Sequence, residues 1–142
     1  MGRGEMASSS HQMSPEFLEE IVAKARSECR PMVFALSSWT EPLLHKNLDR
    51  MIRVVKRAGI DCWFSTNLNR RDMDIHRWHS ILMQRPDVIN VSVSGYSQEV
   101  YSIGHYGGNA ELVWKNLREL CKASQRYLHR TRINVVYHLY KH

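Results

Sequence analysis

The sequence predicts an α/β domain of about four parallel strands with alternating helices, a partial (β/α) barrel. Short apolar runs alternate with amphipathic helical patterns along nearly the whole chain, and strands joined by helices run parallel. A closed eight-stranded barrel needs about 250 residues, and this chain has 142. Two architectures are compatible with this length, a small open sheet and a piece of a larger barrel. No helical pattern follows the last strand, which favours a piece that is incomplete at both ends.

Residues 1–13 are small, polar and Ser-rich, as is typical of a disordered or loop-like lead-in, and residues 14–142 make the domain. The first helix begins at Ser14 as N-cap, with Pro15 in the first helical position. It ends before Pro31, because the residue before a proline disfavours helical angles. Its expected apolar face comprises Phe17, Leu18, Ile21, Val22 and Ala25.

The first apolar run, residues 33–36, is short and continuous, as in a strand buried on both faces. A polar loop follows, and then a helix over about residues 45–58, which Gly59 ends in the left-handed conformation. The buried stripe of this helix comprises Leu48, Met51, Ile52 and Val55. The second strand covers residues 61–66.

The second half of the domain repeats the pattern. Asp72 or Asp74 caps a third helix, whose inner face comprises Ile75, Trp78, Ile81 and Leu82. The third strand covers residues 88–94, and a long loop extends from Gly95 to the glycine pair before Asn109. Asn109 is a good N-cap for a fourth helix over about residues 110–128, and the fourth strand begins at Arg132.

Composition excludes several classes of protein. The net charge is +6, but the basic residues are scattered over the helical segments, so we expect no nucleic-acid partner. No apolar run reaches roughly 18 residues, and the N-terminus lacks the apolar core of a signal peptide. The three cysteines, Cys29, Cys62 and Cys121, have no metal-ligand spacing. These features predict a soluble, cytoplasmic protein without a membrane partner.

Polar residues gather where the predicted strands end, and the carboxyl ends of parallel strands meet at one edge of a sheet. These residues are Ser37, Ser38, Trp39, Thr40 and Glu41; Ser65, Thr66 and Asn67; Ser92, Ser94 and Gly95; and Tyr137, His138 and Lys141. Hydroxyls and amides beside one carboxylate suit a polar zwitterionic ligand that carries a sugar. Solvated loop residues without a ligand explain the same pattern equally well.

Several motifs resemble those of one family. The motif WTEPLLH is followed by a helix and then by a strand that ends in STN. This arrangement resembles the S-adenosylmethionine-binding part of radical SAM enzymes, in which the two motifs usually read GGEP and STNG. The stretch VSVSGYSQEVYSIGHYGGNAELVWKNLREL is similar to the family's S-x-D-G and GGN segment, and INVVYHLYKH resembles its next barrel strand. The resemblance extends from about residue 13 to residue 142 and is closest to SPASM-type members.

The resemblance implies a role for several residues. Glu41 matches the acidic residue that receives the amino group of the methionine moiety. Thr40 and Trp39 match the two positions before it, where many members have glycines. Ser65 and Asn67 match the S-T-N positions that line the S-adenosylmethionine pocket.

The sequence also departs from the family. Ser94 stands where the family often has the Asp of S-x-D-G, near the ribose, and His138 lies on a pocket-closing strand without a motif match. The family binds a [4Fe-4S] cluster through CxxxCxxC, which is absent here, and Cys29, Cys62 and Cys121 do not replace it. We therefore expect a truncated reading frame, a wrongly assigned start, or one portion of a split gene whose remainder is a partner.

The resemblance implies that complete homologues cleave S-adenosylmethionine with the cluster and abstract hydrogen from a peptide or small-molecule substrate. This chain alone is expected to be inactive, with no catalytic or metal-binding residue of its own. The alternative is a non-catalytic α/β module that binds a nucleotide-like ligand or docks a partner through its open sheet edges. A basic domain that binds nucleic acid is a third reading.

Overall fold

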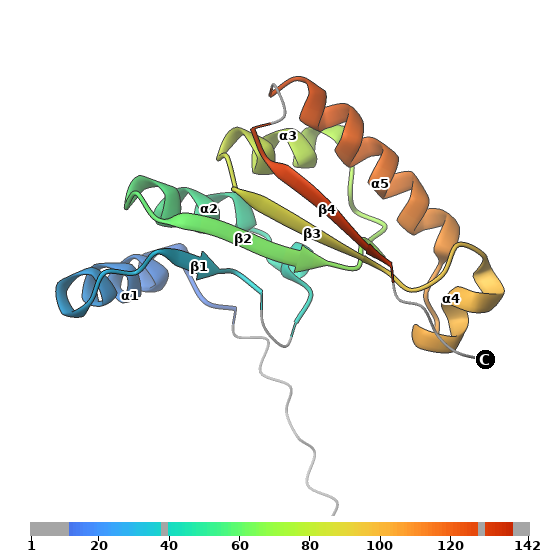
Figure 1. Cartoon of the computed structure of the whole chain (residues 1–142), viewed down its shortest axis with the longest axis horizontal. Coiled ribbons are helices and arrows are strands. Elements are labelled where there is room, and N and C mark those ends of the chain that lie inside the picture. Colours follow the sequence, from blue (N-terminus) through green and yellow to red (C-terminus); the bar gives the residue numbers. More distant parts are fainter. Residues whose placement is uncertain (1–11, 38–39, 128–129, 138–142) are drawn as a thin grey trace, which may run out of the picture.

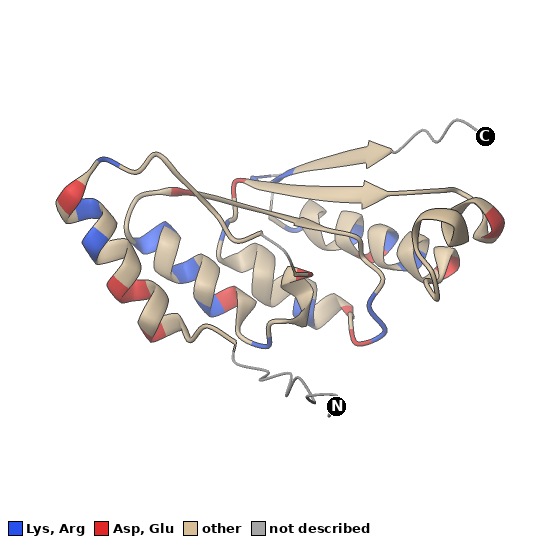
Figure 2. Ribbon diagram, turned by 90° about the horizontal axis from the view of Figure 1, so that it is seen from below, with Lys and Arg blue, Asp and Glu red and all other residues tan. Residues whose placement is uncertain are grey.

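A single parallel sheet with helices over one of its faces makes up the fold (Figures 1 and 2). The computed structural model describes residues 12–37, 40–127 and 130–137. The strands are β1 (Val33–Ala35), β2 (Asp61–Thr66), β3 (Val88–Val93) and β4 (Arg132–Tyr137). They lie in the order β1-β2-β3-β4, and each pairs in parallel with the next.

Apart from α1, which precedes β1, the helices lie between successive strands in the chain, and the four longer ones cover the same face of the sheet. They are α1 (Pro15–Glu28), the 3-10 turn η1 (Pro42–Leu44), α2 (Leu48–Arg57), α3 (Ile75–Met83), α4 (Gln98–Gly104) and α5 (Ala110–Gln125). The predicted fold class, four parallel strands with alternating helices in a partial barrel, is confirmed. A doubly wound sheet would have helices on both faces and a reversal in strand order, and this sheet has neither within its described residues.

Alternation along the strands separates the two faces of the sheet. In β2, Cys62, Phe64 and Thr66 are buried under the helices, and the two residues between them are half-exposed. β3 repeats this, with Ile89, Val91 and Val93 at 0% exposure. The expectation of strands buried on both faces is therefore wrong, because no second layer covers the far face within the part of the chain that is described.

Two local predictions differ from the structure. Phe17 is 53% exposed rather than buried, because α1 lies at the edge of the helix layer and packs mainly on α2. The long loop after β3 contains helix α4, whose N-cap Ser97 accepts a hydrogen bond from the backbone of Val100. Seven residues are too short for helical periodicity to stand out in a sequence.

Asp87 ties the amino ends of three strands together. Its carboxylate Oδ2 accepts hydrogen bonds from Lys56 Nζ at 2.6 Å and from the backbone N–H of Cys62 at 2.7 Å. Its own N–H donates to the Cys62 carbonyl at 2.7 Å, and its carbonyl accepts from the N–H of Arg132 at 2.9 Å. These bonds set the register of β2, β3 and β4 at the end opposite the predicted site.

Among the described helices, none combines the length and the apolar character that a membrane span requires.

Candidate functional site

The loops after β1 and β2 are joined by side chains that the sequence singled out. Ser37 Oγ accepts a hydrogen bond from the N–H of Ser65 at 3.1 Å, and Glu41 Oε2 accepts one from the N–H of Asn67 at 2.9 Å. Glu41 Oε1 caps η1 by accepting from the N–H of Leu43 at 3.1 Å. Glu41 is half-buried, and each of its oxygens keeps a lone pair for a further donor.

The loop after β2 turns sharply at Leu68. Leu68 has φ 57°, which is the left-handed region, and its side chain is fully buried. Thr66 Oγ1 accepts from the N–H of Leu68 at 3.0 Å, and Asn67 Oδ1 accepts from the N–H of Asn69 at 2.9 Å. A leucine therefore holds a left-handed turn that glycine adopts more readily.

The side chain of Asn116 on α5 holds the loop after β2 in place. Its Nδ2 donates to the carbonyls of Leu68 at 2.8 Å and of Arg70 at 2.7 Å, and the side chain is completely buried. The opposite amide orientation would place an oxygen against two carbonyl oxygens, so the direction of donation is fixed. The sequence analysis missed Asn116, since its only signal is a polar residue on the apolar stripe of a helix.

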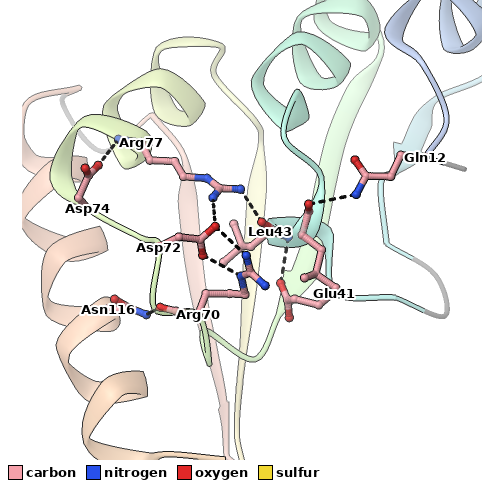
Figure 3. A network of polar contacts seen from close by, with 9 residues as sticks. Gln12, Glu41, Leu43, Arg70, Asp72, Asp74, Arg77 and Asn116 are labelled. Carbon is pink, nitrogen blue, oxygen red and sulfur yellow. Dashed lines mark hydrogen bonds and ion pairs between the residues drawn. The ribbon is translucent and has the colours of Figure 1, made fainter. Parts of the chain in front are cut away.

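A charged network links the two loops to α3 (Figure 3). Arg70 forms two hydrogen bonds with the Asp72 carboxylate, at 2.9 and 2.6 Å, and Arg77 reaches the same carboxylate at 2.8 Å. A second Arg77 nitrogen donates to the Leu43 carbonyl, next to Glu41. The hydrogen bond from Arg70 is the main cause that holds the pKa of Asp72 below its ordinary value, and burial acts in the opposite direction.

A cavity of about 560 Å³ lies between α1, β1 and the start of α2. Its polar lining residues are Gln12, Ser37, Thr40, Glu41 and His45. The apolar part of the wall comprises Met13, Leu18, Ile21, Phe34, Ala35, Leu36, Pro42, Leu44, Leu48 and Met51. A carboxylate, two hydroxyls and an extended apolar wall are the composition expected of a small-molecule site.

The predicted site residues separate into two groups. Thr40 and Glu41 line the cavity, and Glu41 is joined to Asn67. Ser65 and Asn67 lie outside the cavity wall, at the ends of the strands. Ser94 is 1% exposed at the end of β3 and does not line the cavity. Trp39 and His138, also named from the sequence, lie outside the described residues.

The thiols of this chain do not fit an iron–sulfur cluster. Cys29 caps the end of α1, Cys62 lies in the core of β2, and Cys121 is exposed on α5. Burial, with a further contribution from Asp87, raises the pKa of Cys62 to about 12, whereas cluster ligation needs thiolates. Over the described residues, no three His, Cys, Asp or Glu side chains come together in a metal-binding group.

No protein-family model and no curated protein matches this chain. Among solved structures, the chain is similar to the apo, selenomethionine-labelled form of OxsB, a cobalamin-dependent S-adenosylmethionine radical enzyme. The identity is 14% and the TM-score 0.49, with 87% of this chain and 18% of that chain covered. This chain spans less than a fifth of that protein.

Proposed function

We propose that this chain is a radical SAM-like domain and that the loops after β1 and β2 bind S-adenosylmethionine. The observation that carries the proposal is the Glu41 carboxylate, which is half-buried on the cavity wall and held by the N–H groups of Asn67 and Leu43. A carboxylate with one free lone pair on each oxygen is a suitable acceptor for the ammonium group of the methionine moiety.

The surroundings of Glu41 support the same ligand. Ser37 and Thr40 lie beside it on the cavity wall and offer hydroxyls, while the apolar side chains of α1 and β1 suit a thioether chain or a base. The cavity of about 560 Å³ falls within the range of small-molecule and cofactor sites.

In complete radical SAM enzymes a [4Fe-4S] cluster supplies the electron that cleaves S-adenosylmethionine. The cysteines of this chain do not fit such a cluster, so the role we assign to its own residues is to bind and orient the cofactor. Under this proposal, the complete homologue is the protein that carries the cluster and acts on a peptide or small-molecule substrate. The SPASM-type affiliation likewise applies to that homologue.

A partner-docking module is the second candidate. The edge strand β4 supports it, because Val135 and Val136 are 51% and 45% exposed there, one on each face of the strand. Among the described residues, both outer strands, β1 and β4, pair on one side only. Apolar side chains next to an unpaired strand edge are a template for association with another chain.

The test is calorimetric titration of the 142-residue chain with S-adenosylmethionine. Glu41→Gln keeps an acceptor oxygen for the backbone but removes the charge, and we expect affinity to fall by roughly 10- to 100-fold. Glu28→Gln is the matched control, since Glu28 is an exposed carboxylate that pairs with Lys24 at the far end of α1. Absence of binding by the wild type, or equal binding by Glu41→Gln, would refute the proposal.

A further inference from the structure

Two residues that precede α1 form part of the cavity wall. Gln12 and Met13, the last residues of the expected lead-in, line the cavity together with side chains of α1, β1 and the start of α2. Gln12 Nε2 donates a hydrogen bond to the carbonyl of Leu44 in η1 at 3.2 Å (Figure 3). The Met13 carbonyl lies 2.7 Å from Nε2 of His45, the residue after η1. We call Gln12 and Met13 the strap.

The ring of His45 is held so that Nε2 is the donor toward the strap. Its Nδ1 accepts a hydrogen bond from the backbone N–H of Asn47 at 3.1 Å. A neutral imidazole carries one proton, so Nε2 carries it when Nδ1 accepts. The Met13 carbonyl can only accept, and the contact at 2.7 Å is therefore a hydrogen bond from Nε2 to Met13.

The strap has few other ties to the domain. Among the described residues, no backbone–backbone hydrogen bond involves Gln12 or Met13. Gln12 is exposed, and Met13 is 42% exposed. The helix that follows is fixed independently, because Ser14 Oγ caps α1 by accepting from the N–H of Phe17 at 3.1 Å. The strap can therefore detach from η1 while α1 stays in place.

The strap is fastened at the turn that carries the candidate ligand acceptor. Glu41 is the N-cap of η1, and His45 is its C-cap, with an N–H that donates to the Pro42 carbonyl at 2.9 Å. One short turn thus holds the carboxylate at one end and the donor for the strap at the other. Detachment of the strap leaves the bonds of Glu41 to Leu43 and Asn67 intact. The cavity wall can open while the rest of the site stays formed.

We propose that the strap opens and closes this side of the cavity and that His45 is the positioning residue that fastens it. In the closed state Gln12 and Met13 complete the wall, and in the open state solvent and small molecules reach its inner side. Loss of one neutral hydrogen bond shifts such an equilibrium by about 2- to 10-fold. The strap itself does not depend on the ligand, whereas the entry of S-adenosylmethionine past it rests on the proposed function.

A thiol placed inside the cavity measures how often the strap opens. Met51 lies on the cavity wall and is 6% exposed, so Met51→Cys supplies this thiol in a chain that also carries Cys29→Ser and Cys121→Ser. His45→Phe keeps a planar ring and removes the donor. We expect it to accelerate the reaction of this thiol with a disulfide reagent at pH 8 by about 2- to 10-fold. Cys62, fully buried and outside the cavity wall, reports on unfolding in the same sample, and mass spectrometry of the labelled peptides separates the two thiols.

Three variants separate the lost donor from other effects of the substitution. His45→Gln restores an N–H donor, and we expect a rate close to that of the chain with His45. Gln12→Leu removes the other bond of the strap at an exposed position and should act like His45→Phe, so it decides the test if His45→Phe does not fold. His76→Phe is the matched control, because His76 is an exposed histidine on α3, and we expect no change in rate.

Several outcomes would overturn the proposal. Equal rates with and without His45→Phe, or with and without Gln12→Leu where His45→Phe does not fold, show that the strap does not control access. A parallel acceleration at Cys62 shows unfolding instead of opening. A rate in His45→Gln as high as in His45→Phe overturns the role of the His45 donor.

The same thiol distinguishes the strap from the proposed function. S-adenosylmethionine bound in the cavity slows the reaction of the thiol at Met51→Cys, whose position lies on the cavity wall. If His45→Phe has its expected effect but S-adenosylmethionine gives no protection, the strap stands and the proposed function is overturned. If S-adenosylmethionine protects the thiol but His45→Phe and Gln12→Leu change nothing, the strap is overturned and the proposed function stands.

Discussion

Asn116→Ala should destabilise the protein and loosen the loop after β2. The substitution removes two buried hydrogen bonds, to the carbonyls of Leu68 and Arg70 at 2.8 and 2.7 Å. Each bond contributes about 1–1.5 kcal/mol, and the two carbonyls then lie in the interior without a donor. Asn116 Oδ1 has no described partner, and its removal returns part of this energy. We expect a net loss of about 2–3 kcal/mol, or about 6–9 °C in melting temperature for a domain of this size.

The assay is urea unfolding at 25 °C, monitored by circular dichroism, with the slope m compared between variants. Asn134→Ala is the matched control, because the Asn134 amide donates one exposed hydrogen bond, to Asn90 Oδ1 at 3.0 Å. We expect that variant to lie within about 0.5 kcal/mol of the wild type. A loss below about 1 kcal/mol for Asn116→Ala would refute the idea that this side chain holds the loop.

Three further predictions test the core, the charged network and the turn. Of the three thiols, Cys29 and Cys121 are exposed and should react with a disulfide reagent at pH 8, whereas Cys62, with its pKa raised to about 12 by burial, should react only after unfolding; rapid reaction of all three would contradict the burial of Cys62. Because the pKa of Asp72 is lowered in the folded state, its ionised carboxylate stabilises the fold at pH values above the ordinary pKa of 3.8. This stabilisation is lost as the pH falls through the lowered pKa. Asp72→Asn should therefore be less stable than the wild type at pH 7, by less than about 1 kcal/mol since the carboxylate is half-exposed, and the two thermal unfolding curves should converge in acid. At Leu68, with φ 57°, the Gly variant should be about 1 kcal/mol more stable than the Ala variant, the reverse of the usual order, and equal stability in urea would rule out strain at this turn.

Local sequence patterns predicted most of the fold. The second strand was expected over residues 61–66, which are the bounds of β2. Asp74, one of the two expected candidates, caps α3, and Asn109 caps α5 as expected, each by accepting a hydrogen bond from the backbone three residues ahead. Parallel order followed from the helical connections between strands. These features depend on residues that are close along the chain.

The features that the sequence did not reveal depend on distant residues. Asn116 bonds to Leu68, 48 positions earlier, and its local signal, a polar residue on the apolar stripe of α5, does not reveal that partner. Tyr101 is buried because Gly95 and Gly108 leave space around it, and the sequence shows these glycines only as the ends of a loop. The exposure of Phe17 likewise depends on which helices lie next to α1.

Glu41 has a structural role that any functional experiment must separate from ligand binding. Its carboxylate joins the loops after β1 and β2 by accepting from Asn67, 26 positions away, and it caps η1 through Leu43. A carboxylate has about four acceptor sites, and these contacts occupy two of them, so the two roles do not compete. Glu41→Ala abolishes both roles and would reduce binding even if no ligand touched the side chain. Glu41→Gln keeps an acceptor for one backbone contact and removes the charge, so a variant that stays folded but loses affinity would assign the remaining acceptor sites to the ligand.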